Sequence, residues 1–104
     1  LPASLCSSLP RLVKLSLSDN ELETLPAEIS LLTSLETLSV ERNDLVHLPP
    51  QLAHLPRLEV LRAHHNLFES LDTPLPHSLT TLDIAFNALT RLPRPLPHSL
   101  EVLR

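Results

Sequence analysis

One twelve-residue pattern occurs four times in this chain, and it constrains the fold more than any other feature. LSLSDNELETLP begins at Leu15, and LSVERNDLVHLP, LRAHHNLFESLD and LDIAFNALTRLP begin at Leu38, Leu61 and Leu82. Within the pattern, one asparagine recurs at intervals of 23, 23 and 21 residues. Repeats of this length are typical of solenoids, because one such unit has too little apolar surface to form a core alone and stacks on its neighbours.

Each unit places leucine-type residues at every second position, as in Leu15 and Leu17. This alternation predicts one short strand per unit. The expected core positions before each asparagine are Leu12, Leu15, Leu17; Leu35, Leu38, Val40; Leu58, Leu61, Ala63; and Leu79, Leu82, Ile84. Those after it are Leu22, Leu45, Phe68 and Leu89. Parallel strands from successive units would lie about 4.8 Å apart. We therefore predict a stacked parallel sheet, with Phe68 in a core position and not in a binding site.

The recurring asparagines are expected to be structural. The chain has no glycine, yet it must bend after every strand. A buried amide can donate to and accept from the free backbone groups of such a bend. The sequence thus predicts an asparagine ladder formed by Asn20, Asn43, Asn66 and Asn87.

The pattern LxxLxLxxNxL resembles the leucine-rich repeat family over essentially the whole chain. The resemblance implies an α/β solenoid, with a curved parallel β-sheet on the concave face and short helical, 3₁₀ and polyproline II segments on the convex side. We divide the chain into a partial repeat 1–11, four repeats 12–34, 35–57, 58–78 and 79–99, and a partial repeat 100–104. The chain is predicted to be a segment of a longer protein.

The return halves of the repeats fall into two kinds. Residues 25–35 and 48–58 space their apolar positions by three and four, which favours a short helical or 3₁₀ turn entered through a proline. Residues 71–79 and 92–100 carry prolines at every second or third position, which favours polyproline II. The latter are similar to the repeats of bacterial effectors that end in a ubiquitin-ligase domain, although those repeats are usually shorter.

Composition limits the classes of partner that the chain can bind and indicates its compartment. The net charge is −4 with a single lysine, which argues against nucleic acid and anionic membranes, and no apolar run is long enough to span a bilayer. The lone Cys6 favours a reducing, intracellular (cytoplasmic) compartment. No catalytic or cofactor motif occurs. Repeat register explains His77 and His98, which occupy the same place in two LPHSL segments. We predict no catalytic residue, no cofactor and no metal site.

In this family the concave face is the usual partner surface, which directs attention to residues between the core leucines. Arginine and aromatic residues are frequent binding hot spots. The predicted partner-binding residues are Arg42, Arg62, His64, His65 and Phe86, with Glu41 and Asp83 beside them. An alternative is that Asp19–Arg42 and Arg62–Asp83 are only surface ion pairs, each worth about 0–1 kcal/mol.

The sequence therefore predicts a protein–protein interaction module of the scaffold or signalling kind, and not an enzyme. Its partner would be another protein or neighbouring repeats and domains of the same parent chain. Two alternatives stay open. One is a substrate-recruiting arm of a larger enzyme, such as an effector-type ubiquitin ligase, a kinase or a phosphatase. The other is a structural spacer in a large cytoskeletal assembly.

Overall fold

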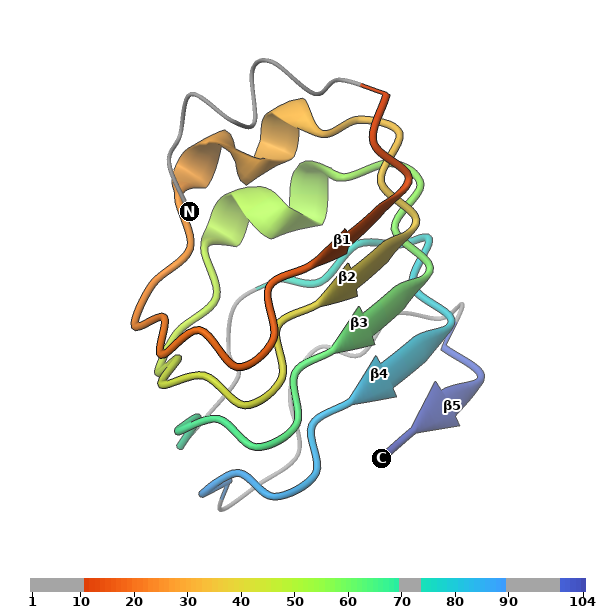
Figure 1. The fold of residues 1–104 in the computed structure, drawn as a ribbon. Coiled ribbons are helices and arrows are strands. Elements are labelled where there is room, and N and C mark those ends of the chain that lie inside the picture. The colour runs from red at the N-terminus through yellow and green to blue at the C-terminus, as the bar shows by residue number, and fades with distance from the viewer. Residues whose placement is uncertain (1–10, 70–73, 90–99) are drawn as a thin grey trace.

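The computed structural model describes residues 11–69, 74–89 and 100–104. These residues contain one parallel sheet with the strand order β1-β2-β3-β4-β5, so each strand lies beside the next one along the chain (Figure 1). The strands are Lys14–Ser16 (β1), Thr37–Ser39 (β2), Val60–Arg62 (β3), Thr81–Asp83 (β4) and Val102–Leu103 (β5). The α/β solenoid with a parallel sheet is confirmed, and each of the four predicted full repeats contains one strand.

Two short 3₁₀ helices, η1 (Ala27–Leu31) and η2 (Pro50–His54), lie side by side on the opposite side of the molecule from the sheet (Figure 1). Each follows an extended N-cap proline, Pro26 or Pro49. η2 also has Pro50 at its first helical position, where the fixed φ of proline suits a helical turn. The predicted 3₁₀ turns of the first two repeats are therefore confirmed. Residues 74–79 form no helix or strand, and the rest of the proline-rich prediction falls on 70–73 and 90–99, outside the described residues.

The strands pair in the same register throughout, because equivalent positions of the repeats face one another. Leu15, Leu38, Leu61, Leu82 and Leu103 form one row across the sheet. A backbone pattern repeats at the entries of β2, β3, β4 and β5. At β2 the carbonyl of Val13 accepts the N–H groups of both Glu36 (2.7 Å) and Thr37 (3.1 Å). Glu36, Glu59 and Thr80 supply the equivalent carbonyls for the strands that follow. This shared hydrogen bonding fixes the register that aligns the outward side chains.

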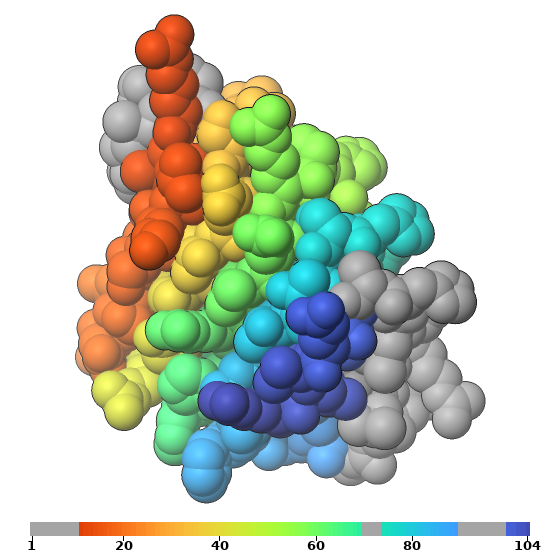
Figure 2. Space-filling model, turned by 90° about the vertical axis from the view of Figure 1, so that its right-hand side faces the viewer, coloured from red at the N-terminus to blue at the C-terminus, as the bar shows by residue number. Residues whose placement is uncertain are grey.

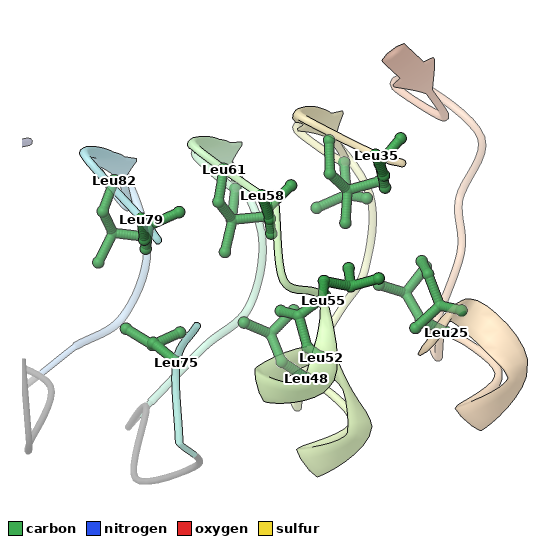
Figure 3. Close-up of a cluster of buried hydrophobic side chains, with 14 of the residues drawn as sticks. Leu25, Leu35, Leu48, Leu52, Leu55, Leu58, Leu61, Leu75, Leu79 and Leu82 are labelled. Atoms are coloured by element: carbon green, nitrogen blue, oxygen red, sulfur yellow. The ribbon is translucent and has the colours of Figure 1, made fainter. Parts of the chain in front are cut away.

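The core lies between the sheet and the return segments and is built almost entirely from leucine. Figure 3 shows two layers, one from the strand side and one from the return side. The strand layer includes Leu35, Leu58, Leu61, Leu79 and Leu82, and the return layer includes Leu25, Leu48, Leu52, Leu55 and Leu75. Phe68 is fully buried, as predicted, and so is the small Ala63. The other side of the sheet carries no helix in the described part of the chain.

Candidate binding surface

We call the uncovered side of the sheet the sheet face: the outward side chains of the strands and of the few residues that follow each strand. Figure 2 shows this side, where successive repeats form adjacent stripes. Register aligns equivalent positions into rows, one of which is Ser16, Ser39, Arg62 and Asp83. Beyond the strands the alignment continues, because Asp19, Arg42 and His65 each donate a backbone N–H to the next repeat. The sheet face is thus a continuous two-dimensional array.

The asparagine side chains hold the bend that ends each strand. Asn43 shows the pattern: its Oδ1 accepts two backbone N–H groups of the preceding repeat, and its Nδ2 donates to carbonyls of both repeats. The partners are the N–H groups of Asn20 and Leu22 and the carbonyls of Leu17, Val40 and Glu41, at 2.8–3.3 Å. Asn87 makes the equivalent bonds two repeats further on. Asn66 makes them one repeat further on, except that among the residues that the structure describes its Oδ1 accepts a single backbone N–H, that of Leu45. One side chain therefore satisfies the backbone on both sides of a repeat junction.

Asn20 differs from the other three. Its side chain is exposed, and among the described residues its Nδ2 donates only to the carbonyl of Ser18, 3.0 Å away within its own bend. The three other asparagines each reach back to a described preceding repeat, whereas the repeat before Asn20 lies outside the described residues. The contacts that Asn20 would make with that preceding repeat therefore lie outside the described residues, and its place in the ladder stays a prediction.

A left-handed residue stands directly before each asparagine, and the sequence did not reveal it. Asp19, Arg42, His65 and Phe86 have φ values of 59°, 58°, 56° and 57°. Glycine normally supplies this conformation, and an L-residue there costs roughly 1–2 kcal/mol. The chain has no glycine, so larger side chains occupy these positions. Three of the predicted partner-binding residues, Arg42, His65 and Phe86, lie in this left-handed row.

An aromatic stack lies at one end of the left-handed row. The rings of His65 and Phe86 are 4.4 Å apart and nearly parallel, at 8°. His64 meets His65 edge-on at 5.5 Å. Phe86 is 75% exposed, the largest exposed fraction among the exposed large hydrophobic residues of the described chain. The structure thus brings three of the predicted partner-binding residues into one exposed aromatic cluster.

Beside this cluster lie the acidic groups of the sheet face. The Nδ1 of His64 is 3.3 Å from Asp83 Oδ2, and both side chains are mostly covered, at 22% and 19% exposure. The contact does not have hydrogen-bond geometry, so the buried Nδ1 has no hydrogen-bond partner among the described residues. The same holds for the buried Oε2 of Glu41, at the equivalent position one repeat earlier. Two polar atoms of predicted site residues are thus left unsatisfied side by side.

The alternative of surface ion pairs needs one correction. Arg62 and Asp83 are register partners, but within the described ranges they form no ion pair. Asp83 instead contacts His64 and accepts the backbone N–H of Ala85 at 3.2 Å, which turns the carboxylate away from Arg62. Arg42 and Asp19 do approach to 4.0 Å, with exposures of 61% and 64%. A pair that long and exposed contributes little to stability.

Two negative findings apply to the described residues only. They contain no group of three or more histidine, cysteine or acidic side chains placed to hold a metal ion. They also contain no helix long and apolar enough to cross a membrane.

The one-strand coils, the parallel sheet and the asparagine bends define a solenoid of leucine-rich units. Residues 10–68, more than half of the chain, match the leucine rich repeat family, and the chain belongs to that family. A solved structure of a leucine-rich repeat protein from Leptospira interrogans is similar, with a TM-score of 0.76 and 32% identity over 86% of this chain. The match spans 23% of the Leptospira chain. No curated protein matches the sequence significantly.

Membership of this family points to a protein–protein interaction module, since leucine-rich repeat domains generally bind other proteins and are typically not enzymes. The seven predicted binding residues all lie on the sheet face or in the bends that border it. The sequence did not single out Lys14, Thr37, Ser39 and Val60 as site residues. The only signal for these four residues was that they alternate with core residues along the strands and so point outward.

Proposed function

We propose that this chain binds another protein through the sheet face, with the His65–Phe86 stack as the main contact. The observation that carries the proposal is the conformation and exposure of Phe86. It is an aromatic residue, 75% exposed, in a left-handed backbone position and stacked on a second left-handed residue. Exposure and backbone strain each raise the free energy of the isolated chain, and a partner that covers the ring would offset the first of them.

Local energetics support this choice. A left-handed non-glycine residue costs roughly 1–2 kcal/mol. Strained residues of this kind concentrate at functional sites. Burying a phenylalanine side chain stabilises a complex by about 1.5–3 kcal/mol, and the stack on His65 already holds the Phe86 ring in place before binding. Phe86 can therefore contribute more to binding than any other exposed apolar residue of the sheet face.

The surrounding charges support a protein partner. Arg42, Arg62, Glu41 and Asp83 give the face both signs of charge within a few residues of the aromatic cluster. A uniformly basic surface would favour nucleic acid or an anionic membrane, and the net charge of −4 disfavours both. Mixed charge around an aromatic centre is typical of the polar rim and anchor residues of protein interfaces.

The test uses the chain as bait in an extract of its source cells, followed by mass spectrometry. The sheet-face variant carries Arg42→Ser, Arg62→Ser, His65→Ser and Phe86→Ser. A matched control carries Leu31→Ser, His54→Ser and Arg57→Ser, which are exposed residues away from the sheet face. We expect a partner that is retained by the wild type and the control and reduced at least about 100-fold in the sheet-face variant, since two anchor residues cost about 3 kcal/mol or more.

Equal capture by all three proteins would overturn the proposal and favour a structural spacer. Loss in the control alone would place the interface on the helical side. Both variants replace exposed side chains, and their folding is checked by circular dichroism before the comparison.

A further inference from the structure

A hollow of about 330 Å³ lies on the sheet face over the first three strands. Its lining comes from two neighbouring rows of outward side chains and one core leucine. The lining residues are Lys14, Thr37 and Val60 from the first row, Ser16, Ser39 and Arg62 from the second, and Leu15. The register aligns both rows directly, so the hollow is a consequence of the repeat and of the small side chains on β2.

The hollow has cations at two opposite corners. Lys14 stands on β1 in the first row, and Arg62 stands on β3 in the second. From strand spacing and rise per residue, their Cα atoms are about 12 Å apart along the diagonal. Both are long side chains that can bend over the small residues between them. No carboxylate lines the hollow, and neither cation forms an ion pair with any other described residue.

Between the cations lie hydroxyl groups. Thr37 and Ser39 are central, and Ser16 lies beside them, with its Oγ 3.3 Å from that of Ser18. In the described part of the chain, the hydroxyls of Thr37 and Ser39 make no hydrogen bond of their own. A hydroxyl can donate to an anion without bringing in a competing charge. The lining thus offers positive charge, hydroxyl donors and the apolar Val60, and it offers no negative group.

We propose that this hollow binds the carboxylate of an acidic residue in the partner protein. The inference rests on the proposed function and deepens it, because it assigns a chemistry to the partner. Charge complementarity with Lys14 and Arg62 selects an anion. Arg62 in addition matches a carboxylate with its planar fork of donors. Lys14 and Arg62 would also attract a phosphate, so the experiment below includes a phosphoserine peptide to separate the two anions.

The position of the hollow adds a second element to the predicted partner. Arg62 ends β3, and the His65–Phe86 stack lies past the ends of β3 and β4 on the same face. A segment that places a carboxylate between Lys14 and Arg62 can continue across the sheet toward Phe86. We therefore expect an extended partner segment with an acidic residue followed or preceded, several residues away, by an apolar one.

The experiment selects binders to the whole chain from a displayed library of random twelve-residue peptides and measures their affinities for four proteins. These are the wild type, a hollow variant (Lys14→Ser, Arg62→Ser), a stack variant (His65→Ser, Phe86→Ser) and a control (Arg11→Ser, Arg57→Ser) that removes two exposed charges elsewhere. We expect selected peptides to be enriched in Asp and Glu. Their affinity should fall at least 10-fold in the hollow variant, and equally when the acidic residue becomes Asn or Gln, with no change in the control.

A charge reversal keeps the test independent of folding effects. Lys14→Glu with Arg62→Glu should abolish binding of the acidic peptide and restore binding when its acidic residue is replaced by lysine. Some peptides could bind the hollow variant with wild-type affinity and fail to bind the stack variant. This result would overturn the carboxylate assignment and leave the proposed function standing. Peptides with unchanged affinity for both variants, or a selection that yields no binders, would contradict the carboxylate assignment and the proposed function alike. Tighter binding of a phosphoserine version would replace the carboxylate with a phosphopeptide.

Discussion

The asparagines differ in burial and hydrogen bonding, and the first prediction concerns their contributions to stability. Asn43→Ala removes a buried side chain that bonds backbone groups on both sides of a repeat junction. We expect a loss of about 1–3 kcal/mol in the free energy of unfolding, because buried N–H and C=O groups lose their partners. The exposed Asn20→Ala should cost less than about 0.5 kcal/mol. Urea unfolding of both variants measures the difference, and equal losses would contradict the assigned roles.

The left-handed row leads to a second prediction. Arg42 has φ 58° and is exposed, so Arg42→Gly relieves roughly 1–2 kcal/mol of strain. The greater freedom of glycine in the unfolded chain costs about 0.5–1 kcal/mol. The variant should therefore be as stable as the wild type or up to about 1.5 kcal/mol more stable. Arg62→Gly is the matched control, since it lies in β3 without a left-handed backbone and should lose about 1 kcal/mol. Thermal unfolding distinguishes the two, and a clear loss for Arg42→Gly would contradict the strain argument.

The sequence identified the residues of the left-handed row as one repeat position but did not predict their backbone conformation. Asp19, Arg42, His65 and Phe86 share one repeat position, which the pattern makes visible. Aspartate and histidine are enriched among left-handed residues, so Asp19 and His65 carried a weak signal for positive φ, whereas Arg42 and Phe86 carried none. The choice of ion-pair partner for Asp83 also depends on side-chain rotamers and not on register. Register alone predicted Arg62, whereas in the structure the Asp83 carboxylate lies 3.3 Å from His64 Nδ1.

At the scale of elements, η1 contains one buried and one exposed apolar residue, and their contributions to stability can be compared. Ile29 and Leu31 both lie in η1, but Ile29 is fully buried and Leu31 is 46% exposed. Ile29→Ala should cost about 2–5 kcal/mol through lost burial and a cavity. Leu31→Ala should cost less than about 0.5 kcal/mol. Chemical unfolding of the pair gives both values, and similar losses would mean that η1 packs differently from the structure.

Period and spacing predicted the elements well because each follows from a local rule. Alternating leucines fixed the strands, and prolines before apolar three- and four-residue spacing fixed η1 and η2. The hollow over β1–β3 was not predictable in the same way. It depends on small side chains in neighbouring strands at matched positions, and it becomes visible only when the repeats stack in a definite register.

At the scale of the whole molecule, stability should vary along the stack. In a solenoid each repeat contacts only its neighbours, so a repeat held on both sides is more stable than one held on one side. Strands β2 and β3 are paired on both sides and carry fully buried central leucines. Strand β5 pairs with β4 alone among the described strands, and Val102 and Leu103 are exposed. In the 104-residue chain, β5 is therefore expected to open more easily than β2 and β3.

Amide hydrogen exchange measured by mass spectrometry tests this gradient. Exchange should be slowest in β2 and β3 and at least about 100-fold faster in β5, because local opening at the end breaks fewer contacts than opening at the centre. The Asn43→Ala variant should speed exchange most at the junction of β1 and β2, since it weakens that interface directly. Uniform exchange in the wild type would show that all repeats open together. The sheet face would then be held by global folding, and the strain in the left-handed row would be supported by the entire stack instead of by its nearest repeats.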